Sequence, residues 1–420
     1  MAHLLIIELP GGNDVDILQA ALDRGDEFTF LSAQLDHYCR QPAVATMLAL
    51  ASELIEVSSF EDIELERCAR AVHARHPIDA VLCLVDIRLR ETARLADQLG
   101  LRFLNPASAA LLRDKFSVRC RLAERGLAQP EFALAESNRA LQEAVDRLGL
   151  PVLIKPADGY GSQNIVVLRY PEDLDPLLSP LGNLLPCRAD YGLGVRANDR
   201  LLVERFMGGQ LIGCDTFSLD GKHTLIGVHE KLMFEPPSFA MRGSCFTPHC
   251  AEFELIERYV KQALDAVDFD CGAAHLELML TEDGPRLVEI NARLVGAKIA
   301  RLVGCTTGRS LHDELIALHL GRPASVASAV TGRVGAIRWI VADHPGILER
   351  VEMSTAGDPR ICCVENLKQP GDHVRPPMDN ADRIGYVMVC AATREEAERV
   401  ADSFVSDAVV VMQASTAASA

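Results

Sequence analysis

A short acidic hairpin between residues 275 and 293 constrains this chain more than any other segment. Alternating residues flank the sequence Glu-Asp-Gly at 282–284, where glycine supplies the positive φ that a three-residue loop commonly needs. If the middle residue of this turn is the centre of a β-hairpin, Glu277 faces Glu289 and His275 faces Asn291.

Side chains alternate across a strand, so the hairpin has two different faces. One face carries His275, Glu277, Met279, Leu287, Glu289 and Asn291. The other face is apolar and is expected to pack on a core; it carries Leu276, Leu278, Leu280, Val288 and Ile290.

The two opposed carboxylates need a physical reason. Like charges directly opposite in a sheet destabilise it, and the Cβ atoms of such a pair lie roughly 5 Å apart. A hard divalent cation provides a reason, because Mg²⁺ binds carboxylate and amide oxygens and keeps sites for water and phosphate. A solvated hairpin face with unrelated acids is the alternative, and the hairpin alone leaves both open.

Composition sets the class of molecule around this hairpin. At 420 residues the chain is too long for one typical core, and two to four domains are expected. The formal net charge of −17 argues against nonspecific binding to nucleic acid or to an anionic membrane. A nucleotide is not excluded, because it needs only a local cationic pocket.

The cysteines and the first residues indicate a cytoplasmic protein. Thirteen cysteines are scattered without a C-x-x-C pair, and Cys245, His249 and Cys250 lack a zinc-site spacing. Reduced thiols used as small apolar residues explain them better. The N-terminal segment is too short and uncharged for a signal peptide, and no apolar run reaches the ~20 residues of a membrane span.

The chain divides into three predicted domains. Strands and helices alternate over residues 1–107, which predicts an α/β domain with a parallel sheet. A central domain over 108–325, with a flap subdomain at about 120–205, and a small α+β domain over 326–420 follow. Within the first domain, strands are expected at 4–7, 27–31, 80–85 and 101–104, and helices at 16–24 and 89–99.

The central domain begins with a helix expected over 108–125, which contains Lys115. Lys155 ends a short apolar strand that Pro156 stops. A glycine-rich segment at 159–164 and a strand at 165–168 follow, so the backbone between the strands could close over phosphates. An ordinary turn is the alternative for this segment.

Further elements follow by the same signals of periodicity and turn residues. We expect an irregular excursion at 178–198, strands at 211–219 and 223–229 joined at Asp220-Gly221, and a loop over the site at 234–249. Helices are expected at 255–267 and 310–320. In the last domain, strands are expected at 335–341 and 385–390 and a helix at 394–405.

Three common catalytic patterns are absent. No H-R-D or D-F-G follows the Lys155 strand, as a protein kinase would require. No Walker P-loop and no G-x-S-x-G elbow is present either. A cationic strand, a glycine flap and an acidic hairpin remain, and together they suit Mg-ATP bound between two subdomains.

The ordered set of motifs resembles the ATP-grasp carboxylate–amine ligases, most closely the bacterial L-amino acid (dipeptide) ligases of antibiotic pathways such as those of bacilysin and tabtoxin. The resemblance covers nearly the whole chain and rests on motifs at 113–115, 154–156, 159–164, 203–204, 275–277, 289–296 and 382–385. It implies an ATP-grasp fold with an N-terminal parallel-sheet domain and a small C-terminal α+β domain.

The resemblance also implies how ATP is held. Lys115 and Lys155 would contact the phosphates or adenine, and the loop with Gly161 and Ser162 would close over the phosphates. Glu204 and the backbone near Phe206 would hold the adenine; a structural salt bridge is the alternative for Glu204. One position departs from the family, since Leu211 stands where a ribose-binding glutamate is usual, with Gln210 as a substitute.

The implied metal and substrate residues lie later in the chain. Glu277, Glu289 and Asn291 would coordinate Mg²⁺, as two ions for which Mn²⁺ can substitute. Arg293 is the implied catalytic residue, meeting the substrate carboxylate and the phosphorylated intermediate. The implied substrate contacts are Lys231, Arg242, His275 and Gly296, although His275 suits a supporting role better than that of a base.

The implied activity joins a carboxylate, from an L-amino acid, to the amine of a second amino acid through an acyl phosphate, giving a dipeptide, ADP and phosphate. The resemblance implies a homodimer with small-molecule amino-acid substrates and without nucleic-acid or membrane partners. Two alternatives stay open: another ATP-grasp ligase of the biotin-carboxylase or purine-pathway type, and a noncatalytic nucleotide-binding regulator.

Overall fold

The N-terminal part is a parallel sheet covered by helices. The computed structural model describes residues 1–12, 14–159, 165–174, 200–235, 238, 240–322, 331–354 and 357–413. Its first sheet has the order β3-β2-β1-β4, all parallel, and β1 is buried throughout. The strands are β1 (His3–Ile7), β2 (Glu27–Ser32), β3 (Glu53–Glu56) and β4 (Ala80–Cys83).

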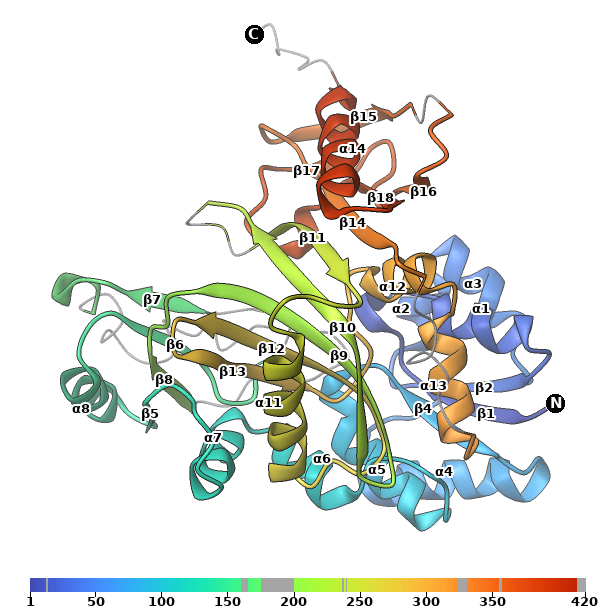
Figure 1. The fold of residues 1–420 in the computed structure, drawn as a ribbon. Coiled ribbons are helices and arrows are strands. Elements are labelled where there is room, and N and C mark those ends of the chain that lie inside the picture. The colour runs from blue at the N-terminus through green and yellow to red at the C-terminus, as the bar shows by residue number, and fades with distance from the viewer. Residues whose placement is uncertain are drawn as a thin grey trace, which may run out of the picture.

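Six α-helices of the described residues surround this sheet (blue in Figure 1). They are α1 (Asp16–Asp23), α2 (Leu35–Cys39), α3 (Pro42–Leu48), α4 (Asp62–Arg75), α5 (Leu89–Gln98) and α6 (Pro106–Leu112). The predicted parallel α/β domain is thus confirmed. The strand expected at 101–104 is wrong, because this segment pairs with no strand and instead buries Leu104 and packs Phe103 between two hydrophobic clusters.

The helix expected over 108–125 is two helices. α6 ends at Leu112, and α7 (Lys115–Glu124) begins after Asp114, whose side chain accepts a hydrogen bond from the Ser117 N–H. An N-cap aspartate satisfies a backbone donor that a helix end leaves free, so it restarts the helix and places Lys115 in the first turn of α7.

The flap is an antiparallel sheet of order β5-β8-β6-β7 (green in Figure 1). Its elements are β5 (Phe132–Ala135), α8 (Asn138–Leu148), β6 (Val152–Pro156), β7 (Val166–Leu168), the short η3 turn (Pro171–Asp173) and β8 (Leu201–Arg205). The glycine loop beyond Gly159 and the excursion expected at 178–198 lie outside the described residues.

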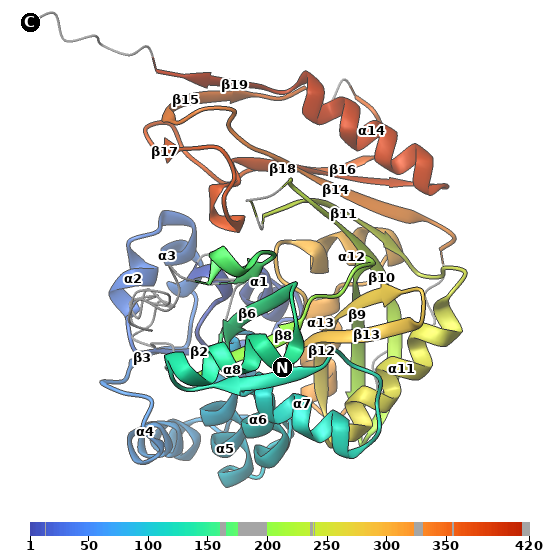
Figure 2. The ribbon, with the colours of Figure 1, turned by 90° about the vertical axis from the view of Figure 1, so that its left-hand side faces the viewer.

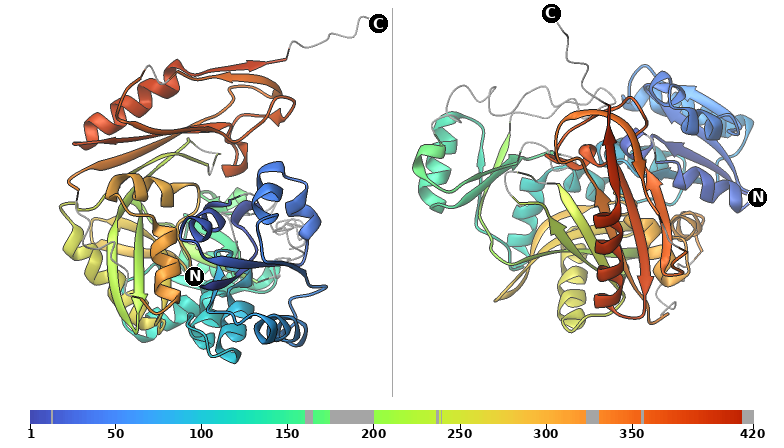
Figure 3. Two further views of the ribbon diagram at one scale, coloured as in Figure 1. Left: turned by 90° about the vertical axis from the view of Figure 1, so that its right-hand side faces the viewer. Right: turned by 90° about the horizontal axis from the view of Figure 1, so that it is seen from above.

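An eight-stranded sheet of order β13-β12-β9-β10-β11-β14-β18-β16 forms the centre of the molecule. Its strands are β9 (Gln210–Leu219), β10 (Lys222–Met233), β11 (Met241–Thr247), β12 (Gly272–Thr281), β13 (Gly284–Asn291), β14 (Val334–Ile340), β16 (Ile361–Asn366) and β18 (Gly385–Ala391). The flap and the N-terminal sheet lie at opposite ends of the molecule (Figures 1 and 3).

Helices cover both faces of the central sheet. α11 (Phe253–Ala266) packs against β10 and β13, while α12 (Ile299–Thr307) and α13 (Leu311–His319) connect the other face with the N-terminal helices. The loop expected at 234–249 is largely wrong, because β11 occupies its second half and pairs with both β10 and β14. Within the described residues, no helix is both long and apolar enough to cross a membrane.

The C-terminal part shares the central sheet through the pairing of β11 with β14. It adds α14 (Arg394–Asp407) and a three-stranded sheet of β15 (Gly346–Glu352), β17 (His373–Val374) and β19 (Val409–Met412), seen at the top of Figure 2. Because the sheet runs through both parts, the boundary at 325/326 remains a prediction.

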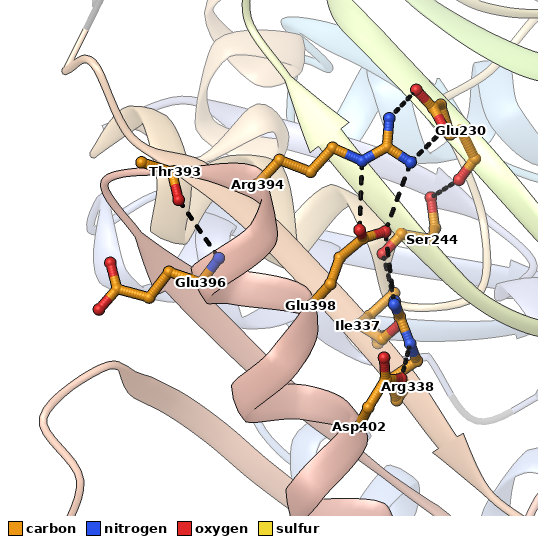
Figure 4. Close-up of polar contacts among 9 residues, drawn as sticks. All are labelled: Glu230, Ser244, Ile337, Arg338, Thr393, Arg394, Glu396, Glu398 and Asp402. Carbon is orange, nitrogen blue, oxygen red and sulfur yellow. Dashed lines mark hydrogen bonds and ion pairs between the residues drawn. The ribbon is translucent and has the colours of Figure 1, made fainter.

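A chain of alternating charges fastens α14 to the central sheet (Figure 4). Arg394, at the start of α14, pairs with Glu230 of β10 and with Glu398 one turn later. The buried Arg338 of β14 reaches Glu398 and lies 2.6 Å from Asp402. This network fixes the C-terminal helix against β14 and against β10, which also carries Lys231.

Candidate active site

The hairpin of β12 and β13 has the predicted pairing at its acidic residues. Glu277 pairs with Glu289, and His275 pairs with Asn291. The register shifts after Glu277, so the turn has two residues between Thr281 and Gly284 rather than three. The placement of Leu287 on the site face is therefore wrong, because the bulge turns this side chain into the core beside α11.

Each of the two carboxylates contacts its own lysine. The Lys231 Nζ lies 2.5 Å from Glu277, and the Lys115 Nζ lies 2.9 Å from Glu289. Burial alone would raise the pKa of Glu277, but the surrounding positive charges, Lys231 foremost, outweigh burial and lower it to about 2. Glu277 is therefore ionised, and lysines of two elements, α7 and β10, lie against the opposed acids.

Lys155 lies in a buried ion-pair group at the base of the flap. Its Nζ is 2.8 Å from Glu204 of β8, whose other oxygen is 2.5 Å from Nε of Arg119 on α7. All three side chains are buried. Burial lowers the pKa of Lys155 while Glu204 opposes the shift; burial would raise the pKa of Glu204, but Arg119 and Lys155 outweigh it and lower it to about 2.

The bulge in the hairpin completes this group. The Val288 carbonyl accepts hydrogen bonds from Arg119 at 3.1 Å and from Lys155 at 3.4 Å. Lys115 also donates to the Gly159 carbonyl at 2.5 Å, where the glycine loop begins. The flap, α7 and the acidic hairpin thus meet at one edge of the central sheet.

Arg293 faces the N-terminal domain. Its Nε donates to Asp86 at 2.6 Å, and its Nη1 donates to the Leu294 carbonyl at 2.9 Å. Asp86 follows β4, at the carboxyl end of a parallel strand, where ligands of open α/β sheets commonly bind. The arginine and a buried acid of another domain therefore lie together next to the hairpin.

His275 is held from behind by a buried aspartate. Asp215 of β9 accepts a hydrogen bond from the His275 Nδ1 at 2.7 Å and a second one from His229 of β10. The three groups lie close enough to hold a metal ion, yet the aspartate already satisfies one nitrogen of each ring. His275 Nε2 lies 3.9 Å from Glu277, which agrees with a supporting role.

Gly213 makes room for this arrangement. It lies opposite Glu277 on β9, and a Cβ atom there would lie 2.6 Å from the His275 Cε1 and 3.3 Å from the Lys231 Cε. Any larger residue would therefore displace the histidine ring, because the interior is closely packed and leaves no space for a side chain at this position.

Several predicted residues stand apart from this cluster. Arg242 is exposed on β11, and Gly296 lies between β13 and α12, next to two residues with positive φ. The Phe206 N–H donates to the Pro151 carbonyl, so this donor is not free for adenine. Gln210 is exposed at the start of β9 beside Leu211. Gly161 and Ser162 lie outside the described residues.

Sequence reasoning missed four residues of the site, although each has a signal. Arg119 lies four residues after Lys115 on one helix face. Asp86 follows a buried strand, His229 precedes Lys231 by the period of a strand, and Asp215 lies opposite His275.

The donor set suits a hard divalent cation. The carboxylates of Glu277 and Glu289 and the Asn291 amide lie on one face. The amide nitrogen of Asn291 donates to the His275 carbonyl at 3.5 Å, which leaves its oxygen for a cation. Carboxylate and amide oxygens are the ligands that Mg²⁺ prefers. Lys115 and Lys231 show that positive charge is stable beside these carboxylates. The residues present therefore fit the expected Mg²⁺ ion.

Comparison with known proteins agrees with this geometry. Residues 148–301 match the model of the ATP-grasp domain, and residues 338–413 match that of the L-amino acid ligase C-terminal domain 2. The chain therefore contains an ATP-grasp domain. Lys155, Glu204 and the acidic hairpin all lie inside it. ATP-grasp ligases use ATP and Mg²⁺, which agrees with the expected cofactors.

The curated relatives of this chain include an L-amino acid ligase. It is 23% identical to the L-arginine-specific L-amino acid ligase of Bacillus subtilis over 62% of this chain and 62% of that protein. It spans between 52% and 62% of the length of this and two other curated relatives.

Two solved structures share the ATP-grasp fold. The L-amino acid ligase from Bacillus licheniformis has a TM-score of 0.80 at 20% identity, covering 98% of this chain and 99% of that chain. The biotin carboxylase domain of the Hydrogenobacter thermophilus 2-oxoglutarate carboxylase, in complex with MgADP and bicarbonate, has a TM-score of 0.72 at 17% identity, covering 97% and 90%. The expected fold is confirmed.

Proposed function

We propose that this protein is an ATP-dependent carboxylate–amine ligase that joins an L-amino acid to a second amino acid and yields a dipeptide, ADP and phosphate. The observation that carries the proposal is the acidic pair Glu277–Glu289 flanked by lysines from the flap side and the sheet, with Arg293 beside it. The match to the L-amino acid ligase C-terminal domain supports the substrate class.

Four side chains would bind and orient the nucleotide. Lys155 and Lys115 stand where they can neutralise phosphate charge, which phosphoryl transfer requires. Glu204 holds the Lys155 ammonium in place, and Arg119 keeps Glu204 ionised. Mg²⁺, held by Glu277, Glu289 and Asn291, would supply charge neutralisation between the phosphates when bound.

The carboxylate substrate would attack the γ-phosphate and form an acyl phosphate, which the amine of the second amino acid then attacks. Arg293 would stabilise the oxyanion of this second step, and Asp86 orients its guanidinium by the bond at Nε. His275, backed by Asp215, would keep the Glu277 carboxylate in position. The flap would exclude water, which otherwise hydrolyses an acyl phosphate.

The test is ADP formation with L-amino acids supplied singly and in pairs, with mass spectrometry of the products. Glu289→Gln should lower amino-acid-dependent ADP formation at least about 100-fold, the low end for loss of an electrostatic group. Glu282→Gln is the matched control, because Glu282 lies in the turn of the same hairpin and should keep full turnover.

Other outcomes would decide between the alternatives. ADP formation that depends on bicarbonate rather than on amino acids would favour a biotin-carboxylase-like ligase. No ADP formation with any amino acid, together with a biological effect that survives Glu289→Gln, would favour a noncatalytic nucleotide-binding regulator. The homodimer and the cytoplasmic location stay predictions that sizing and fractionation can check.

A further inference from the structure

Three cysteines far apart in the sequence meet at one edge of the C-terminal part. Cys362 lies on β16, Cys390 on β18 and Cys305 near the end of α12. The Cys362 and Cys390 Sγ atoms are 3.6 Å apart, and Cys305 also contacts Cys362 by a hydrogen bond. The proposed ligase chemistry uses none of them.

A β-bulge brings the first two sulfurs together. β16 is the last strand in the order of the central sheet and pairs only with β18 among the described strands. The register shifts between Ile361 and Cys363, so Cys362 is the extra residue and its Sγ donates to the Met388 carbonyl at 3.3 Å. An extra residue re-aims its side chain, here toward Cys390 on the neighbouring strand.

The two thiols differ in access, as a reactive pair requires. Cys362 is exposed, whereas Cys390 is 2% exposed and its sulfur lies 3.5 Å from the Thr306 hydroxyl. The hydrogen bond with Cys362 lowers the pKa of Cys390 against the effect of burial, whereas the hydrogen bonds with Cys305 and Cys390 raise the pKa of Cys362. The buried thiol is therefore the more acidic of the two, and the accessible thiol lies in front of it.

We propose that Cys362 and Cys390 form a dithiol site for low-molecular-weight disulfides such as oxidised glutathione, and that the reaction closes a reversible disulfide between them. This inference does not depend on the proposed ligase function. The sulfurs need to approach by only about 1.5 Å to reach a disulfide bond length.

The exchange is balanced in two steps. The Cys362 thiol loses its proton and its sulfur attacks one sulfur of oxidised glutathione, which forms a mixed disulfide. The first glutathione leaves as a thiolate and takes up this proton. The Cys390 thiolate then attacks the Cys362 sulfur and releases the second glutathione. Two protein thiols are oxidised by two electrons, one glutathione disulfide is reduced, and the two thiol protons end on the two glutathione molecules.

The experiment treats the fully reduced protein with excess oxidised glutathione, quenches it with acid, and measures the intact mass and the linked peptides. The wild type should yield a peptide pair that joins Cys362 to Cys390, two hydrogens lighter than the separate peptides, with no glutathione on either of these two cysteines. Dithiothreitol should reverse the change. The reduced and oxidised proteins should keep the same monomer mass on a non-reducing gel.

Two variants and one control complete the test. Cys362→Ser and Cys390→Ser should each remove the linked peptide pair. Cys390→Ser should leave Cys362 accessible to glutathione without its partner on β18. Cys39→Ser is the matched control and should form the same Cys362–Cys390 link as the wild type, because Cys39 lies exposed on α2, far from these strands in the sequence.

Several results would overturn the inference. They are a wild type that keeps all its thiols, glutathione that stays on Cys362 unresolved, a link from Cys362 to Cys305 instead, and a disulfide between two chains. Because the peptide map is made on the wild type, the test stands even if a serine variant fails to fold.

Discussion

Replacing Arg119 by methionine tests whether the buried group around Lys155 is held together by charge. Arg119 is almost fully enclosed and its Nε lies 2.5 Å from Glu204. Methionine fills much of the volume but removes the cation, so Glu204 keeps Lys155 as its single neutralising partner, and the Val288 carbonyl loses its nearer donor.

The size of the effect follows from the contacts. With charge centres about 4 Å apart and an effective dielectric of about 20, the pair is worth about 4 kcal/mol, and removing one partner of a buried pair typically costs about 3–5 kcal/mol. Arg119 also repels Lys155, and the loss of this repulsion recovers part of the cost. We therefore expect a loss near the lower limit, about 3 kcal/mol.

Thermal unfolding followed by circular dichroism measures this loss. At about 2 °C per kcal/mol for a large domain, Arg119→Met should lower the midpoint by about 6 °C. Arg121→Met is the matched control on the same helix, because its ion pairs with Glu124 and Asp268 are on the surface. Exposed pairs contribute at most about 1 kcal/mol, so the control should shift the midpoint by less than about 2 °C.

Equal shifts for the two variants would refute this reasoning, since they would mean that burial adds nothing to the Arg119 pair. A second check is the triple replacement of Arg119, Lys155 and Glu204 by apolar residues. Removing a whole buried group is often neutral or stabilising, so the triple variant should be more stable than Arg119→Met while losing ATP turnover.

Two further predictions concern packing and pH. Gly213→Ala should lower turnover and cost about 1–3 kcal/mol by pushing against His275 and Lys231, whereas Gly208→Ala, with open space around its Cβ position, should do neither in the same turnover and unfolding assays. Burial lowers the pKa of His319 to about 4, so the unfolded chain binds the proton more tightly than the folded protein does. The contribution of His319 to the free energy of unfolding is full above pH 6.5 and falls by about 3 kcal/mol as the pH drops to about 4. His319→Asn should flatten this part of an acid-unfolding series, and an unchanged slope would contradict the assignment.

Local patterns predicted two parts of the candidate site, the acidic hairpin and the strand that carries Lys155. The pairing of Glu277 with Glu289 follows from alternation about a turn, and both are properties of a few adjacent residues. The strand that ends at Lys155 follows in the same way from a short apolar run stopped by proline. In both cases a few neighbouring residues determine where the strand lies and which side chains share a face.

Elements that depend on distant partners could not be predicted in this way. β11 follows two prolines and contains Gly243, where a Cβ would lie 2.7 Å from the Ile337 carbonyl, so it is a strand only because β10 and β14 flank it. Residues 101–104 resemble a short strand in sequence, but they pair with no strand; Leu104 is buried and Phe103 packs partly buried against two hydrophobic clusters. Propensity is overridden by tertiary context in both segments.

The contact between Arg293 and Asp86 shows how a contact between distant residues could be predicted from the sequence. The two residues are separated by 207 positions, and no periodicity relates them. The rule that ligands of open α/β sheets bind beyond the carboxyl ends of the strands would nevertheless have selected the residues after β4 once the parallel sheet was predicted. Opposite charge then leaves few candidates for Arg293, and Asp86 is both acidic and buried. Combining a fold-level rule with charge complementarity thus reaches pairs that spacing along the chain cannot reveal.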